Sequence, residues 1–275
     1  MSTEQTIAAH YGRSDIEQKI LAALKAAGKD IERLTTADLA PVDEFHTGGR
    51  AATIAFAELF APKRGEYLLD IGCGIGGPAR YFAETHGCRV SGIDLTDEYV
   101  RAAQALARRT GLDGAVDYRA GSALALPWPD ATFDAAYMLH VGMNIEDKGA
   151  LFKEVRRVLK PGGRFGIYDV MRRADGALTF PAPWAAAAEQ SFVDTADTYR
   201  RLLKAAGFAI EQERDRRAFA LEFFRKQREV AAKSGSPPLG THIIIGPAAR
   251  GRFANYAAMI EQGLVAPAEI VARAG

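Results

Sequence analysis

The feature that most limits the fold of this chain is a cluster of glycines directly behind a short apolar run. Residues 67–71 are typical of a buried strand, and glycines follow at positions 72, 74, 76 and 77. Pro78 suits the first turn of a helix. A strand, a tight turn and a helix in this order let a ligand approach the backbone where a Cβ would block it. The segment therefore predicts a ligand-binding turn in an α/β protein.

Strand and helix patterns alternate along most of the remaining chain. Further strands are expected at residues 89–94, 116–120, 133–139, 164–170, 208–214 and 269–273. Helical patterns lie between them, at about residues 78–85, 97–110, 148–159 and 196–206. This alternation predicts the α/β fold class, with a mostly parallel sheet that carries helices on both faces.

Helical segments also precede and interrupt this pattern. Residues 16–28 and 49–60 are expected to be helices ahead of the first strand, so we define residues 1–62 as the leading segment. Within it, residues 43–52 form a polar, glycine-containing junction segment. We assign residues 63–275 to the main domain, with a helical insertion at about 216–266 before the last strand. We expect the leading segment and the insertion to form a lid that excludes water from a bound small molecule.

Composition argues against several classes of protein. The 275 residues carry 35 Lys and Arg against 34 Asp and Glu, and a net charge of +1 does not favour a nucleic-acid partner. No apolar run is long enough for a transmembrane helix, and the polar first residues predict neither a membrane partner nor a signal peptide. Two cysteines fit a reducing, cytoplasmic location, and the histidines and cysteines lack metal-ligand spacing. The oligomeric state stays open, with a homodimer as one option.

An acidic residue at the end of the second expected strand points to a ribose. Asp94 lies 22 residues after Gly72, where a carboxylate can accept hydrogen bonds from both ribose hydroxyls. Aspartate is also common after strands as a solvated turn residue. Gly72, Gly74 and Gly77 satisfy the spacing of a dinucleotide-binding turn, so an NAD-dependent oxidoreductase is a rival interpretation. Asp70 argues against it, because an acid is unfavourable near a pyrophosphate and suits a site that faces a cation.

Four motifs together resemble those of class I methyltransferases that use S-adenosylmethionine (SAM). They lie at residues 69–76, 91–95, 126–134 and 158–164, in the order and at the spacing of that family. The junction segment is similar, more loosely, to the subgroup that includes sarcosine and dimethylglycine methyltransferases. The resemblance implies a Rossmann-like sheet of seven strands, the last one antiparallel, with SAM as cofactor and S-adenosylhomocysteine (SAH) as product. It also implies a small-molecule acceptor with an N, O or C nucleophile.

The same resemblance implies roles for individual residues. The cofactor-binding residues would be Gly48, Gly49, Gly72, Cys73, Gly74, Asp94, Leu95, Ser122, Ala123 and Leu139. Asp94 would bind the ribose, with Leu95 against adenine, and the junction segment with His46 and Arg50 would close over the methionyl carboxylate. Ser122 stands where the family usually has an acid that meets the adenine amine, so this contact is weaker or is made by the backbone.

Methyl transfer from a sulfonium is an in-line displacement, so the protein mainly aligns the acceptor with the S–CH3 bond. A general base is needed only if the acceptor carries a proton that leaves early. The candidate bases are His140, His46 and Tyr11, and each could instead have a packing or capping role. The candidate acceptor-binding residues are Met143, Asn144, Trp184, Phe223 and His242.

Three alternatives to a methyltransferase acting on a small molecule stay open at this point. The first is the NAD-dependent oxidoreductase, which would bind NAD and not SAM. The second is a SAM-binding protein that has lost methyl transfer and acts as a regulator. The third is a methyltransferase whose acceptor is a protein or an RNA. All four functions are compatible with a glycine turn in an α/β fold, and the fold alone does not decide between them.

Overall fold

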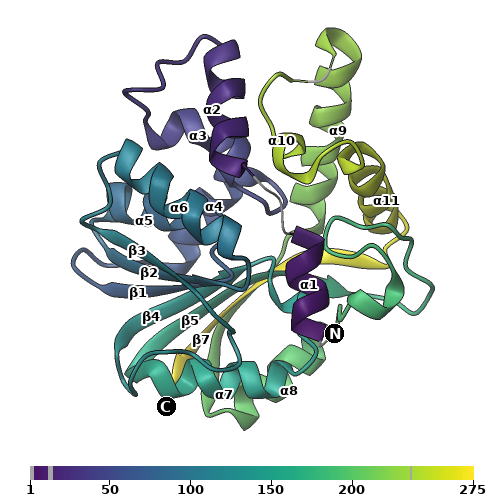
Figure 1. Cartoon of the computed structure of the whole chain (residues 1–275). Helices are drawn as coiled ribbons and strands as arrows, with labels where there is room; N and C mark the ends of the chain where they lie inside the picture. The colour runs from purple at the N-terminus through teal and green to yellow at the C-terminus, as the bar shows by residue number, and fades with distance from the viewer. Residues whose placement is uncertain (1–2, 12–14, 236) are drawn as a thin grey trace.

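A seven-stranded sheet in the order β3-β2-β1-β4-β5-β7-β6 forms the centre of the molecule (Figure 1). The computed structural model describes residues 3–11, 15–235 and 237–275, with the backbone alone for Ala9 and Tyr11. The strands are β1 (Tyr67–Ile71), β2 (Arg89–Asp94), β3 (Val116–Ala120), β4 (Phe133–Leu139), β5 (Leu159–Arg172), β6 (Phe208–Asp215) and β7 (Val265–Ala274). Strands β1 to β5 pair in parallel, whereas β7 is antiparallel to β5 and β6. The predicted fold class is therefore confirmed.

Helices cover both faces of this sheet. One face carries α4 (Gly49–Phe60), α5 (Gly77–His86) and α6 (Asp97–Arg109), and the other carries α7 (Lys148–Val158) and α8 (Ala196–Ala205) (Figure 1). On the first face, the Phe82 ring lies 4.7 Å from that of Tyr137 in β4. On the second, the Phe152 ring lies 5.8 Å from that of Phe165 in β5. An apolar core on each face thus holds the sheet in place. A rigid sheet in turn fixes the positions of the strand ends, as a precise ligand site requires.

The remaining helices come from the two ends of the chain. Helices α1 (Thr3–Tyr11), α2 (Ile16–Ala26) and α3 (Thr36–Asp43) precede the sheet, and α9 (Arg217–Ser234), α10 (His242–Ile245) and α11 (Ala249–Glu261) form the insertion between β6 and β7. Helix α10 packs on α2 and α3, where Ile244 joins the apolar cluster of Ile20 and Leu24. Within the described ranges, none of the helices has the length and apolarity needed to cross a membrane.

Several elements differ from the sequence-based expectation. Helix α3 is not predicted because Pro41 lies inside it. A capping box starts it nonetheless, since Thr35 Oγ1 accepts from the Asp38 amide (3.2 Å) and the Asp38 carboxylate accepts from the Thr35 amide (3.0 Å). Strand β7 begins at Val265 rather than at residue 269, and Pro267 pairs with Val170 within it. Strand β5 is also longer than residues 164–170.

Candidate cofactor and acceptor site

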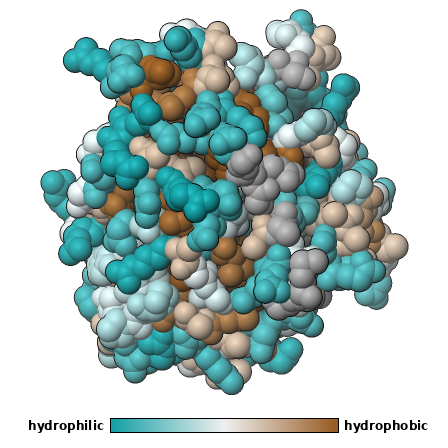
Figure 2. Space-filling view, in the orientation of Figure 1, coloured by the Kyte–Doolittle hydropathy of each residue, from teal (hydrophilic) through white to brown (hydrophobic). Residues whose placement is uncertain are grey.

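A cavity of about 470 Å³ lies at the carboxyl ends of strands β1 to β4. Its lining combines the turns after these strands with side chains of α1, of the short helix η1 (Gly142–Asn144) and of the insertion. Parallel α/β sheets bind their ligands at this edge. In the space-filling view, apolar side chains reach the surface in the centre of this face among hydrophilic ones (Figure 2). The size and lining suit a small organic ligand.

The glycine turn lies at the floor of the cavity, against the end of β2. The amides of Gly72 and Cys73 both donate to the carbonyl oxygen of Ile93, at 2.8 and 3.0 Å. Gly72 and Gly74 have φ angles of 68° and 52°, in the left-handed region that favours glycine. A Cβ on Gly72 would lie 2.5 Å from a methyl carbon of Val141, so close packing also requires glycine at this position.

Asp94 is fixed at the cavity by backbone amides. Its Oδ2 accepts a hydrogen bond from the Gly74 amide and its Oδ1 accepts one from the Thr96 amide, each at 2.9 Å. Burial raises the pKa of this carboxyl group, while the two amides favour its charged form. Because Asp94 lines the cavity, its remaining lone pairs can accept hydrogen bonds from the hydroxyl groups of a ligand such as ribose.

His140 follows β4 in a left-handed conformation, with a φ of 57°. Its amide donates to the Tyr168 carbonyl (2.6 Å), and its ring centroid lies 4.9 Å from that of Tyr168. Its Nε2 atom is buried and has no hydrogen-bond partner within the described part of the chain. Burial, together with the nearby His46 ring, lowers the pKa of His140 well below its usual range. The imidazole is therefore neutral, and burial disfavours its protonated form, while the residue lines the cavity wall.

His46 lies behind His140, with 6.1 Å between the ring centroids, and is outside the cavity lining. In its Nε2-protonated tautomer it donates to the Gly49 carbonyl (3.1 Å) and to the Thr53 hydroxyl (3.0 Å). Burial lowers the pKa of His46 to about 4. These contacts hold the junction segment on α4, which is a packing role rather than a contact with the cavity.

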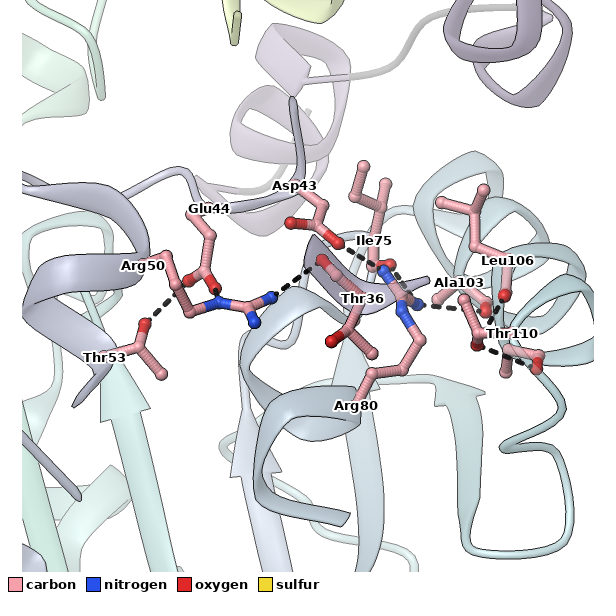
Figure 3. Close-up of polar contacts among 12 residues, drawn as sticks. Thr36, Asp43, Glu44, Arg50, Thr53, Ile75, Arg80, Ala103, Leu106 and Thr110 are labelled. Carbon is pink, nitrogen blue, oxygen red and sulfur yellow. Dashed lines mark hydrogen bonds and ion pairs between the residues drawn. The ribbon is translucent and has the colours of Figure 1, made fainter. Parts of the chain in front are cut away.

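Buried ion pairs fasten the junction segment to the glycine turn (Figure 3). The fully buried Arg80 guanidinium donates to the Asp43 carboxylate (2.7 Å) and to the Ile75 carbonyl (2.8 Å). The Glu44 carboxylate accepts from Arg50 (2.5 Å). Arg50 is thus directed toward Glu44, and it does not line the cavity where a methionyl carboxylate was expected to meet it. Burial raises the pKa of Asp43 to about 6, and the neighbouring Arg80 counteracts this rise.

Aromatic side chains form the wall opposite the glycine turn. Trp184 and Tyr256 meet edge to face, with ring centroids 5.2 Å apart. The Asn144 side-chain amide donates to the Trp184 carbonyl (2.8 Å), and the Thr47 hydroxyl donates to the Tyr256 hydroxyl oxygen (3.1 Å). Since the Tyr256 oxygen accepts this bond, its own proton can be donated elsewhere. The wall therefore offers apolar area with a few oriented polar groups, the usual composition of a small-molecule pocket.

The structure brings only part of the predicted site together. The predicted residues that line the cavity are Gly72, Gly74, Asp94, Leu95, Ala123, Leu139, His140, Met143, Asn144 and Trp184. Those outside the lining are His46, Gly48, Gly49, Cys73, Ser122, Phe223 and His242. Phe223 packs on Phe224 with ring centroids 5.3 Å apart, and His242 is exposed at the start of α10. The side chain of Tyr11 lies outside the described residues, so its role stays a prediction.

Two residues of the glycine motif face the protein interior. Asp70 is buried beneath the turn, does not line the cavity, and has a pKa that burial raises to about 8. Burial likewise raises the pKa of the Cys73 thiol, well above its usual range. In residues 3–11, 15–235 and 237–275, no group of three or more His, Cys, Asp or Glu side chains is placed to hold a metal ion.

The lining residues that sequence reasoning missed include Glu4, Thr47, Phe253 and Tyr256. Glu4 belongs to α1, a helix that the sequence pattern does not predict. Phe253 and Tyr256 lie three residues apart on α11 and so share one face of that helix. This aromatic spacing in a predicted lid helix is the signal that could have identified them, whereas Thr47 is polar and carries no such signal.

The sheet order, the glycine turn after β1 and the acid after β2 define a class of protein. They are the features expected of a class I SAM-dependent methyltransferase, and residues 69–167 match the family described as methyltransferase domain. The chain therefore carries a class I SAM-dependent methyltransferase domain.

Named relatives support this assignment. Over 107 residues the chain is 37% identical to sterol 24-C-methyltransferase ERG6B of Gibberella zeae. This aligned stretch covers 39% of this chain and 28% of that protein. Over 187 residues it is 36% identical to the phosphoethanolamine N-methyltransferase of Triticum aestivum, and this stretch covers 67% of this chain and 36% of that protein. The chain thus spans about a third of the length of the curated relatives it matches.

A solved structure agrees with the fold along the whole chain. The geranyl diphosphate C-methyltransferase of Streptomyces coelicolor A3(2), solved in complex with Mg²⁺, geranyl-S-thiolodiphosphate and SAH, has a TM-score of 0.72 with this chain. The comparison covers 100% of this chain and 99% of that one, at 19% sequence identity. At this identity the likeness establishes the shared fold and not a shared acceptor.

Proposed function

We propose that this chain binds SAM in the cavity and transfers its methyl group to a small-molecule acceptor, with SAH as the product. The observation that carries the proposal is the position of Asp94, whose carboxylate is held at the cavity by the amides of Gly74 and Thr96. Ribose hydroxyls can donate to this carboxylate, and the methionyl part can then lie over Gly72 and Gly74. The methyltransferase domain at residues 69–167 supports the same assignment.

When bound, SAM supplies a methyl group on a positively charged sulfur, which the lone pair of an acceptor can displace in line. The chain then contributes alignment and the exclusion of water. We assign these tasks to Leu139 and His140 at the end of β4, where the cofactor and acceptor parts of the cavity meet. If the acceptor atom carries a proton, His140 is our candidate to take it, because of its place in the cavity lining.

The aromatic wall favours an acceptor with an apolar body. Trp184, Phe253 and Tyr256 line this part of the cavity together with Met143, while Asn144 supplies a polar group. An N, O or C nucleophile on such a molecule would face the methyl group. The proposal includes closure of the cavity by the leading segment and the insertion. A role in small-molecule metabolism, a cytoplasmic location and a homodimer remain sequence-based parts of it.

SAM labelled in its methyl group tests this proposal directly. The protein is incubated with labelled SAM and a cell extract, and the small molecules are separated from the macromolecules before both fractions are counted. We expect label in the small-molecule fraction. Label in the macromolecular fraction alone would point to a protein or RNA acceptor. SAM binding without transfer would indicate a regulator, and NAD binding without SAM binding would indicate the oxidoreductase.

A pair of aspartate variants, compared by calorimetric titration with SAM, tests the position of the cofactor. Asp94→Ala should weaken SAM binding by roughly 1–3 kcal/mol, the scale of hydrogen bonds to a charged acceptor. Asp97→Ala makes the same chemical change at an exposed position outside the lining and should bind SAM almost as well as the wild type. Equal SAM affinities of a folded Asp94→Ala protein and the wild type would remove Asp94 from the site.

A further inference from the structure

Helix α1 forms one wall of the cavity, with Thr3, Glu4 and Ile7 in the lining. Figure 1 shows this helix apart from α2, in front of the sheet. Toward its other end, Arg252 of α11 donates to Nε2 of His10 (2.8 Å). The helix thus connects the sheet side of the cavity with the insertion, so a ligand that engages Glu4 would also engage α1.

The loop after β3 presents a serine to Glu4. The Ser122 hydroxyl oxygen accepts a hydrogen bond from the Leu124 amide (3.0 Å), and the hydroxyl donates to Oε1 of Glu4. Glu4 lines the cavity, whereas Ser122 lies outside the lining. A carboxylate has a second oxygen and further lone pairs. Ser122 therefore orients Glu4 and leaves it able to accept another hydrogen bond from a ligand.

The surroundings of Glu4 suit a flat base. If the ribose binds Asp94 and the methionyl part lies over the glycine turn, the nucleobase occupies the side of the cavity that faces β3. Ile93, Leu95, Ala123 and Leu124 line this side and provide apolar contact for the faces of an aromatic ring. Glu4 supplies a carboxylate next to this apolar part of the lining.

We infer that Glu4 accepts a hydrogen bond from the exocyclic amine of adenine, and that Ser122 positions Glu4 for this contact. The inference rests on the proposed function, because the adenine arrives as part of SAM. An amine donates hydrogen bonds to a carboxylate, whereas a keto oxygen at the same place would be repelled by it. The acid that the family resemblance places at position 122 is thus supplied by another element, and base recognition requires α1 to be in place.

Calorimetric titration with SAH and with S-inosylhomocysteine, which carries a keto oxygen in place of the amine, tests the contact. The wild type should bind SAH about tenfold more tightly than the inosyl compound, as expected for one hydrogen bond to a charged group. Glu4→Ala should lose most of this preference, mainly through weaker binding of SAH. Ser122→Ala should lose part of it, because Glu4 then lacks its fixed orientation.

Glu146→Ala is the matched control, because it removes another carboxylate from the lining, at the end near α7. Its preference for SAH should equal that of the wild type, which separates base recognition from general attraction of a cation. The ratio of two affinities does not depend on the folded fraction of a variant. A wild-type ratio in Glu4→Ala would overturn the inference and leave the proposed function intact. Failure of the wild type to bind SAH would overturn both.

Discussion

Burial keeps two histidines beside the cavity neutral, and this has a consequence for stability in acid. Burial lowers the pKa of His46 from 6.5 to about 4 in the folded protein. Between these values the unfolded chain holds more protons than the folded one, so falling pH favours unfolding. The stabilisation is complete above about pH 6.5 and is lost as the pH falls toward about 4. Asp43, with a pKa that burial raises to about 6, acts in the opposite sense.

Replacing His46 with Gln isolates this contribution, because Gln can hydrogen bond but does not titrate. We expect the difference in unfolding free energy between wild type and His46→Gln to shrink by roughly 2–3 kcal/mol between about pH 7 and pH 4.5. Urea unfolding at both pH values measures it. His242→Gln changes the same residue type at an exposed position and should show no such trend. A gap that stays constant or widens in acid would contradict the assignment.

At the residue scale, sequence reasoning succeeds where the functional side chains are close along the chain. The glycine turn and Asp94 belong to short motifs at the ends of neighbouring strands, so their meeting follows from the βαβ pattern. Glu4 meets Ser122 across 118 residues, and Thr47 meets Tyr256 across 209. Such pairs depend on how helices outside the sheet are placed, which no local pattern in a single sequence specifies.

Among the elements, the junction segment is held by the insertion as well as by the sheet. Gly48 has a φ of 92°, and a Cβ at this position would lie 2.3 Å from Cε1 of Phe219 in α9. Thr47 donates to Tyr256 of α11 in the same region. Segments far apart in the sequence therefore touch beside the cavity, and the glycine is what permits their close approach.

Gly48→Ala should destabilise the protein by about 2–4 kcal/mol, which combines left-handed strain of roughly 1 kcal/mol with overpacking of about 1–3 kcal/mol. Gly28→Ala is the control, because Gly28 has a φ of 78° and no atom within 4 Å of its added Cβ. The loss of stability in Gly28→Ala should equal the contribution of left-handed strain alone. Denaturant unfolding of both variants measures the difference. In a Phe219→Ala background the extra cost of Gly48→Ala should disappear, and its persistence would show that the contact with α9 is not its source.

The predicted elements were most accurate where the sheet imposes a regular spacing. Strands β1 to β4 lie at their expected positions, since each is a compact apolar run between turn residues. Helix α1 carries little apolar periodicity, and Pro41 obscures α3, so both escape a pattern-based reading. Strand β7 contains a proline that a central strand usually excludes, and its flanking pairs with β5 hold it in the sheet.

Across the whole molecule, three parts of the chain surround one cavity. Helix α1 contributes Glu4, the junction segment contributes Thr47, and α11 contributes Tyr256, while the sheet supplies the glycine turn. Hydrogen bonds such as that from Thr47 to Tyr256 join these parts at the cavity. The junction segment is also held by its buried ion pair with Arg80, and α11 by apolar packing on the sheet. Individual hydrogen bonds contribute only about 1 kcal/mol each, so the contacts at the cavity can open locally while the ion pairs, the apolar packing and the sheet stay intact.

A bound ligand should therefore tighten these parts together. Because SAH would bind the closed form and not the open one, we expect it to slow backbone hydrogen exchange in α1, the junction segment and α11 as well as in the glycine turn. The amides of α8, which contributes no residue to the lining, should change least. Asp94→Ala at the same SAH concentration should show weaker protection throughout, since fewer molecules are occupied. Protection confined to the glycine turn and the end of β2 would mean that the cofactor binds without closing the helices, and that they respond to the acceptor instead.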